Sequence, residues 1–414
     1  MLLDRVLRFG VSAGSLTVHY PHGLSRRYGD GTGAPVAFAV SSSAAATRIA
    51  INPELQLGEA YMDGSLTLRQ GSLFDLLLLL MGNFRAAGSP AHHRLLARAR
   101  VAARRLHQFN PVAVARNNVA HHYDLDGRLY DLFLDADRQY SCAYFASPDA
   151  TLEEAQTAKM RHIAAKLALQ PGQTVLDIGS GWGGLALYLA KYAEVDVTGL
   201  TLSTGQHEAA TARARTAGLS HRVRFLLRDY REMTGRFDRI VSVGMFEHVG
   251  LNHYGEFFRQ CAALLKPDGV AVLHAINRPT GPDATSPWIQ KYIFPGGSIP
   301  ALSEVLPPLE RAGLTLSDAE ILRLHYAETL RHWRRRFLAR RAEAVALYDE
   351  RFARMWEFYL AASEAAFRLG DLNVFQLQFL RRQQALPITR RYMAEAEAAL
   401  ARRDHPVPVP RAAE

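Results

Sequence analysis

A glycine-rich turn that follows an apolar strand is the first place in this sequence where a ligand could be held. Residues 175–184 read Val-Leu-Asp-Ile-Gly-Ser-Gly-Trp-Gly-Gly, and a helical pattern follows over 185–192. Glycines at such a turn let the backbone come close to a ligand, and the next helix presents free N–H groups at its first turn. This arrangement is typical of nucleotide-type sites in parallel α/β sheets.

The glycine spacing alone is compatible with two cofactors. Gly179, Gly181 and Gly184 also fit the dinucleotide fingerprint, which is a weak signal by itself. Two details favour S-adenosylmethionine. Asp177 precedes Gly179 by two residues, where its carboxylate could meet a cationic amine or merely orient the turn. The next expected strand, 195–200, ends in Thr-Leu-Ser, without the acid that a nicotinamide ribose usually requires.

Composition sets the broad class of protein. The chain has 414 residues, of which 48% are hydrophobic and 21% charged, and this predicts a globular protein of two domains. No apolar run approaches the roughly 20 residues that span a bilayer, and the first 15 residues lack the apolar stretch of a signal peptide. Cys142 and Cys261 form no disulfide framework and have no metal-ligand spacing around them. We therefore expect a cytoplasmic protein without a metal.

The positive net charge of the chain favours anionic partners but does not identify one. A net charge of +9 attracts anions in general, including nucleic acid and anionic lipid. Only five of the 49 basic residues are lysines, and basic residues do not alternate with aromatic ones as in a nucleic-acid reader. We expect no nucleic-acid partner.

Four segments are expected along the chain. Residues 1–82 predict a small α+β domain, for which a lipid-binding role is left open, and 83–119 a linker that carries a basic helix at 91–109. Residues 120–403 alternate strands with helices, which predicts a parallel α/β sheet. The fold expected there is a Rossmann-like class I methyltransferase domain with helical additions. Residues 404–414 are expected to be a disordered tail.

The individual elements follow from apolar patterns and cap residues. In the first domain we expect strands at 16–20, 35–40 and 48–51, and a helix after Ser72 that ends near 81. The strands of the large domain are expected at 174–178, 195–200, 222–228, 239–243 and 270–276. Beyond 280 we expect a Pro/Gly-rich loop and then helices only.

Polar residues follow the expected strands of the large domain. Because parallel strands end at one edge of a sheet, these segments are expected to converge on one site. They are 201–206, 229–231, 244–250 and 273–276.

Together with three further segments, these residues resemble the cyclopropane-fatty-acid and mycolic-acid cyclopropane synthase family. The further segments are 140–145 (Tyr-Ser-Cys-Ala-Tyr-Phe), 291–297 (Lys-Tyr-Ile-Phe-Pro-Gly-Gly) and 325–330 (His-Tyr-Ala-Glu-Thr-Leu). The resemblance covers 120–395 densely. Residues 1–80 resemble the N-terminal domain of the phospholipid branch of that family.

The resemblance implies a reaction. The methyl group of S-adenosylmethionine is attacked by the cis double bond of an unsaturated phospholipid acyl chain, and a carbocation forms. A bound bicarbonate ion then removes a proton from the new methyl group, and the ring closes. The family's ligands of that ion fall here on Cys142 and Ile276 (through backbone), Glu247, His274 and Tyr326, while Tyr123 should line the reaction cavity.

The resemblance also implies a cofactor site and a partner surface. The cofactor residues carried over are Tyr140, Ser141, Asp177, Gly179, Gly181, Thr201, Ser203, Gln206, Asp229 and Tyr230. The protein is expected to associate peripherally with a membrane surface, and a homodimer is left open.

Several of these residues have ordinary structural interpretations. Cys142 could be a small buried hydrophobe, His274 a hydrogen-bonded core histidine, and Tyr326 an aromatic residue at a helix start. The arginines between Arg331 and Arg336 could be a solvated face or a lipid-headgroup site.

One residue bears on the outcome of the reaction. Asn277 stands where many relatives carry a glycine, directly after the His-x-Ile segment. Its amide could shift the base, or it could only cap a turn. The alternative function is therefore methylation of the acyl chain without ring closure, which gives methyl-branched unsaturated lipids.

Overall fold

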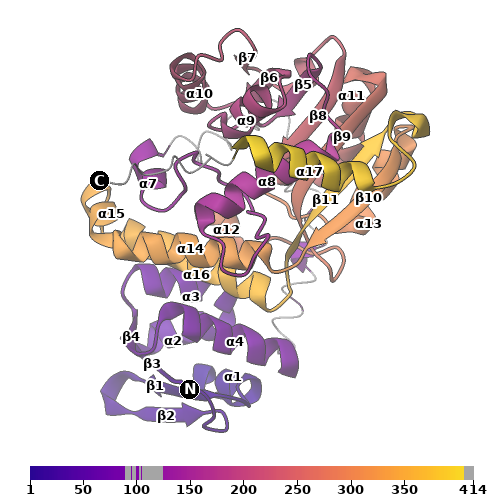
Figure 1. Ribbon diagram of the computed structural model, residues 1–414. Helices are drawn as coiled ribbons and strands as arrows, with labels where there is room; N and C mark the ends of the chain where they lie inside the picture. The colour runs from indigo at the N-terminus through magenta and orange to yellow at the C-terminus, as the bar shows by residue number, and fades with distance from the viewer. Residues whose placement is uncertain (89–94, 96–98, 102–103, 105–124, 405–414) are drawn as a thin grey trace, which may run out of the picture.

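The computed structural model describes residues 1–88, 95, 99–101, 104 and 125–404, and the description below is limited to them (Figure 1). Tyr123 lies outside the described residues, as do most of the basic helix expected at 91–109 and the tail from 405 onward.

The N-terminal unit is a four-stranded sheet with helices packed on it. The strand order is β2-β1-β3-β4, and β1 pairs parallel with β3. The strands are β1 Ser15–His19, β2 Ser25–Tyr28, β3 Pro35–Val40 and β4 Leu66–Gln70. The helices are α1 Leu2–Gly10, α2 Ser43–Ile51, α3 Pro53–Met62 and α4 Leu73–Ala87.

Two helices of this unit differ from the sequence-based expectation. The strand predicted at 48–51 is wrong, because these residues are the last turn of α2. Ser42 caps that helix, and its buried residues Ala45, Ala46, Ile49 and Ala50 follow the helical period. The helix predicted after Ser72 is confirmed, with a capping box between Ser72 and Asp75, but it runs to Ala87 and so passes the boundary expected at 82.

The large unit is built on a seven-stranded sheet. Its order is β10-β11-β9-β8-β5-β6-β7, and β11 runs antiparallel to both of its neighbours. The strands are β5 Thr174–Ile178, β6 Asp196–Thr201, β7 Val223–Leu227, β8 Phe237–Val243, β9 Leu265–Asn277, β10 Thr315–Leu322 and β11 Asn373–Leu380. The chain order reverses between β5 and β8, and ligands bind beyond the carboxyl ends of strands at such a point.

Helices cover this sheet and extend beyond it. Those of the first half are α7 Gly127–Asp131, α8 Leu152–Lys166, α9 Gly184–Tyr192, α10 Thr204–Thr216 and α11 Tyr254–Leu264. Those of the second half are α12 Pro287–Tyr292, α13 Leu302–Arg311, α14 His325–Ala339, α15 Arg341–Leu347, α16 Glu350–Arg368 and α17 Arg391–Asp404. Single 3₁₀ turns lie at Pro21–Gly23, Tyr230–Glu232, Phe246–His248, Leu251–His253 and Gln383–Ala385.

The five strands expected in the large unit are all present, and two further strands complete the sheet. β10 and β11 form from segments where we expected only loops and helices. Asn373–Leu380 nevertheless alternates glutamine with apolar residues, which is the strand period, although in the structure both faces of β11 are buried. The missed strands matter because β11 pairs with β9, which carries candidate site residues.

Helices α14 and α16 join the two units. In Figure 1 they lie between the N-terminal unit and the seven-stranded sheet, and α16 packs against both α3 and α4. Polar contacts between α3 and α12 also join the two units. The Glu59 carboxylate accepts from Lys291 Nζ at 2.6 Å and from the Tyr292 hydroxyl at 2.8 Å. One continuous buried apolar cluster therefore extends from α1 to α16.

Charged residues at the surface of these helices are engaged in ion pairs. Arg331 pairs with Glu328, Arg334 with the buried Glu364, and Arg336 with Glu153. Two of the four arginines expected as a solvated face or a headgroup site, Arg334 and Arg336, thus tie α14 to α16 and α8, and Arg331 pairs within α14.

Asp404 is the ordered last residue of α17 rather than the start of a tail. Its carboxylate accepts from the Arg161 guanidinium at 2.7 and 3.0 Å and from the Tyr188 hydroxyl. Among the described helices, none is long and apolar enough to cross a membrane.

Candidate active site

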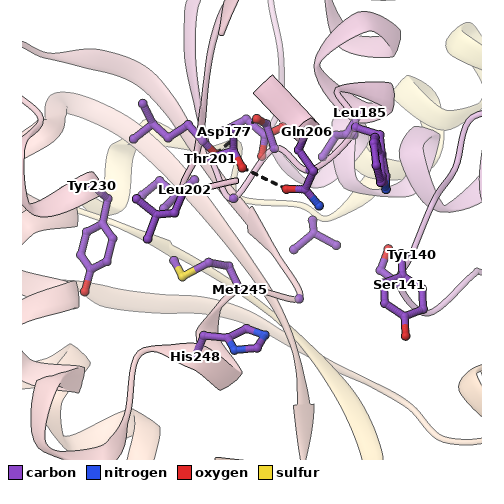
Figure 2. A pocket seen from close by; sticks show the side chains of 18 of the residues that line it. Tyr140, Ser141, Asp177, Leu185, Thr201, Leu202, Gln206, Tyr230, Met245 and His248 are labelled. Atoms are coloured by element: carbon purple, nitrogen blue, oxygen red, sulfur yellow. Dashed lines mark hydrogen bonds between the residues drawn. The ribbon is translucent and has the colours of Figure 1, made fainter. Parts of the chain in front are cut away.

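The first pocket lies beyond the carboxyl ends of β5, β6 and β8, and it collects the expected cofactor residues from distant parts of the chain (Figure 2). Tyr230 and Leu202 stand at one end of it, and Tyr140 and Ser141 at the other. Of the ten residues expected to bind cofactor, nine line this pocket: Tyr140, Ser141, Asp177, Gly179, Gly181, Thr201, Gln206, Asp229 and Tyr230.

The tenth, Ser203, is buried but does not line the pocket. Its hydroxyl accepts from the Gln206 backbone N–H at 3.2 Å and caps α10. Gln206 is thereby held where its side-chain oxygen accepts from the Thr201 hydroxyl at 2.9 Å, as Figure 2 shows. Ser203 acts on the pocket through the helix it caps.

The glycine turn requires glycine for two different reasons. Gly179 has φ +90°, and a Cβ atom there would lie 2.7 Å from the Cβ of Met245. Gly181 has φ +53°, and a Cβ atom there would meet nothing within 4 Å, because that face is open to the pocket. The backbone N–H groups of Gly179 and Ser180 donate to the Leu200 carbonyl, which ties the turn to β6.

Asp177 is buried beneath this turn and also lines the pocket. One of its carboxylate oxygens has no hydrogen-bond partner among the described residues. Burial raises the pKa of Asp177 to about 7, against the opposing effect of the Lys159 ammonium. A buried, unpaired carboxylate of this kind fits a cationic amine placed in the pocket.

A second pocket adjoins the first and collects the described residues expected to be catalytic. Cys142, Glu247, His274, Ile276 and Tyr326 all line it. Both pockets are lined by Tyr140, Ser141, Gly244 and His248, so these residues lie where the two pockets adjoin. Much of the remaining wall is apolar: Ile289, Phe294, Ile299, Leu330, Phe367 and Leu372.

Glu247 is fixed by the backbone of β9. Its Oε1 accepts from the Ile276 N–H at 2.7 Å, while its Oε2 is buried without a hydrogen-bond partner among the described residues. Burial raises the pKa of Glu247 to about 7. The Ile276 N–H therefore positions Glu247, and the expected role of the Ile276 backbone toward a small ion stays a prediction.

His274 is neutral and oriented by a residue of β11. Gln376 lies opposite it in the β9–β11 pairing, and Gln376 Nε2 stands 3.1 Å from His274 Nδ1. Because the amide donates to Nδ1, the ring proton is on Nε2. Burial and the nearby Lys159 and Lys166 lower the pKa of His274 well below its ordinary value.

Cys142 and His248 are also kept uncharged. Burial raises the pKa of the Cys142 thiol and lowers that of His248 to about 4. The His248 ring packs edge-on against Phe294 with ring centroids 5.7 Å apart.

Asn277 does not face either pocket. Its Nδ2 donates to Asn373 Oδ1 of β11 at 2.7 Å. Side chains alternate along a strand, so His274 and Ile276 share one face of β9 and Asn277 takes the other. The expectation that its amide could reach a base beside His274 is therefore wrong, and its bond to Asn373 also differs from a turn cap.

The sequence offered only partial signals for the residues we did not foresee. For Gln376, the signal that could have been used is the strand-like alternation of residues 373–380. His248 lies within the segment 244–250, which the sequence marks only as a whole, and Gln139 and Lys159 have no local signal because their partners lie on other elements.

The strand order, the single antiparallel strand and the glycine turn at the switch point define a class I S-adenosylmethionine-dependent methyltransferase. The chain belongs to the mycolic acid cyclopropane synthetase family, whose model matches residues 112–377. A separate domain of unknown function matches residues 6–87.

Three relatives illustrate the similarity. The chain is 40% identical to the cyclopropane-fatty-acyl-phospholipid synthase of Escherichia coli over 334 residues, 81% of this chain and 85% of that one. It is 37% identical to the tuberculostearic acid methyltransferase UfaA1 of Mycobacterium tuberculosis over 387 residues, 86% and 87% of the two chains. The solved mycolic acid cyclopropane synthase CmaA1, complexed with SAH and CTAB, superposes with a TM-score of 0.61 at 35% identity, over 66% of this chain and 99% of that one.

The open face of Gly181 gives a prediction for the cofactor pocket. Gly181→Val should abolish binding of S-adenosylmethionine, because the new side chain fills the space in which the backbone of the turn approaches the cofactor. The control is Gly172→Val, an exposed turn position with φ +78° and open surroundings, which imposes comparable backbone strain away from the pocket. Calorimetry should find binding in the control and none in Gly181→Val; unchanged affinity in the latter would remove the glycine turn from the site.

Proposed function

We propose that this enzyme transfers a methyl carbon from S-adenosylmethionine to the cis double bond of an unsaturated phospholipid acyl chain and closes a cyclopropane ring. The observation that carries the proposal is the second pocket, in which an apolar wall surrounds Glu247, His274 and Tyr326. That pocket adjoins the cofactor pocket through Tyr140, Ser141, Gly244 and His248.

S-adenosylmethionine, when bound, supplies an electrophilic methyl group. An alkene is a weak nucleophile, so the site must accept positive charge without offering a stronger nucleophile of its own. Burial keeps Cys142 as a thiol, which is far less nucleophilic than a thiolate. The apolar wall excludes water, which would otherwise capture a cation.

A base must then remove one proton, and we propose bicarbonate in that role. Glu247, His274 and Tyr326 would hold the ion, together with backbone near Cys142. Two features support the fit: the buried Oε2 of Glu247 has no partner among the described residues, and the proton of His274 is on the nitrogen away from Gln376. With its pKa near 7, Glu247 can be protonated and donate a hydrogen bond to the anion.

Methylation without ring closure is the second candidate. It is favoured by the 37% identity to a tuberculostearic acid methyltransferase over 86% of this chain. The two outcomes differ only in which proton leaves the cationic intermediate, which depends on where the base sits.

The product decides between these candidates. A cyclopropane lipid and a methyl-branched unsaturated lipid are isomers, so mass alone does not separate them. We expect NMR of lipids from cells that express the chain, supplied with methyl-labelled S-adenosylmethionine precursor, to show labelled ring methylene protons. Label confined to a methyl branch or an olefinic carbon would establish the second candidate instead.

Removal of one hydroxyl tests the ion site. Tyr326→Phe should lower turnover about 10-fold to 1000-fold, the range found for positioned proton-transfer and charge-stabilising groups, and leave cofactor affinity unchanged. Tyr192→Phe, on the far end of α9, is the matched control. Strict removal of bicarbonate should slow the wild type as well, and turnover indifferent to both changes would reject the bicarbonate mechanism.

We also propose that the enzyme docks reversibly on a membrane surface from the cytoplasmic side. Its net charge of +9 supports attraction to anionic lipid, which is screened over a Debye length of about 8 Å at physiological salt. Sedimentation with vesicles should show stronger binding to anionic than to zwitterionic lipid, weakening as salt rises. Binding that ignores both headgroup charge and salt would mean that apolar insertion dominates.

A further inference from the structure

Lys159 is a buried lysine placed directly behind the cofactor pocket. It lies on α8 and is 1% exposed. Its ammonium donates to Ser141 Oγ at 2.9 Å and to Gln139 Oε1. Ser141 and Gln139 both line the cofactor pocket, whereas Lys159 does not. The hydrogen bonds of the lysine therefore reach the pocket through these two side chains, and its charge also acts on the pocket residue Asp177.

These two hydrogen bonds determine which atoms the side chains can present. An ammonium only donates, so both bonded oxygens act as acceptors toward Lys159. The Ser141 hydroxyl proton and the Gln139 amide N–H groups are consequently directed elsewhere. The Gln139 amide nitrogen lies against Gly184, where any side chain would collide with it. Gly184 is the first residue of the nine-residue helix α9, whose free N–H groups open on the same end of the pocket.

Hydrogen bonds also hold the backbone of residues 139–141. Gln156, also on α8, donates from Nε2 to the carbonyls of Gln139 at 3.2 Å and Ser141 at 3.0 Å. Hydroxyl, amide and helix N-terminus thus form a set of donors, with a cation behind them. Such a set suits an anionic group of a ligand.

Titratable groups surround Lys159 on three sides. Asp135, Asp137 and Cys142 face it from the segment before α8, Asp177 from β5, and His274 from β9. Burial lowers the pKa of Lys159 to about 8, although the surrounding acids oppose this. Arg138 also lines the pocket, and its Nε and Nη2 donate to the Asp131 carboxylate at 2.7 Å.

We propose that Lys159 is a positioning residue for the carboxylate of the methionine part of the cofactor, acting through Ser141 and Gln139. The assignment rests on the cofactor orientation in the proposed function, in which Tyr140 and Ser141 meet that carboxylate. The lysine sets the direction of both donors and adds a positive potential behind them.

Two ligands separate this role from a purely structural one. S-adenosylhomocysteine carries the carboxylate, and methylthioadenosine lacks the whole amino-acid end. Lys159→Met should weaken S-adenosylhomocysteine about 10-fold to 100-fold, the range for hydrogen bonds to charged groups, and leave methylthioadenosine within twofold. Lys166→Met is the matched control, because Lys166 is equally buried on α8 but pairs with Glu320 and Asp318 away from the pocket. Its two affinities should match those of the wild type.

Kinetics and pH provide independent readouts. Lys159→Met should raise KM for S-adenosylmethionine more than it lowers kcat. In the wild type, affinity for S-adenosylhomocysteine should fall as pH rises through about 8, where Lys159 loses its charge. Lys159→Met should lack this fall in affinity. Any change in affinity that comes from titration of the ligand's own amine should appear in both proteins.

Two results would overturn the proposal: equal weakening of both ligands in Lys159→Met, or unchanged binding of S-adenosylhomocysteine. Failure of the proposed lipid chemistry looks different. In that case the wild type forms no methylated lipid, while the ligand-selective loss in Lys159→Met persists.

Discussion

The hydrogen bond from the Ile276 N–H to Glu247 Oε1 connects the sheet to the site, and the rest of the site depends on it. Glu247 lies in a short turn after β8, and Ile276 near the end of β9. The parallel pairing of these strands, with Val243 opposite His274, brings the turn beside the strand end. The same register places His274 at the second pocket and Asn277 on the opposite face. A slip of one residue would reverse this order, because side chains alternate along a strand.

Burial gives the two pockets a common electrostatic character. It raises the pKa of Asp177 and Glu247 to about 7 and lowers that of His248 to about 4. The reaction space is thus lined by groups that are neutral or close to their point of titration. Such groups cost folding free energy, and they are retained where function requires them. A neutral wall also offers no strong nucleophile to a cation.

Helices inserted between β9 and β11 provide the other half of the second pocket. Residues of α12, α14 and α16 face the sheet residues across it, and α16 is itself packed against α3 and α4 of the N-terminal unit. Glu59 of α3 binds Lys291 and Tyr292 of α12, on the same helix as the pocket residue Ile289. The N-terminal unit therefore supports the wall that the proposed acyl chain would touch.

The sequence by itself determined the features that depend on local backbone chemistry. The glycine turn, the strands from 174 to 276 and the capped helices follow from short-range patterns, and family motifs led to the residues of both pockets. Even the orientation of Asn277 was available from strand alternation. Tertiary structure alone decided the partners: Gln376 is 102 residues from His274, and Lys159 is 18 from Ser141. It also decided the pKa values, because desolvation depends on everything packed around a group, and no local pattern records that.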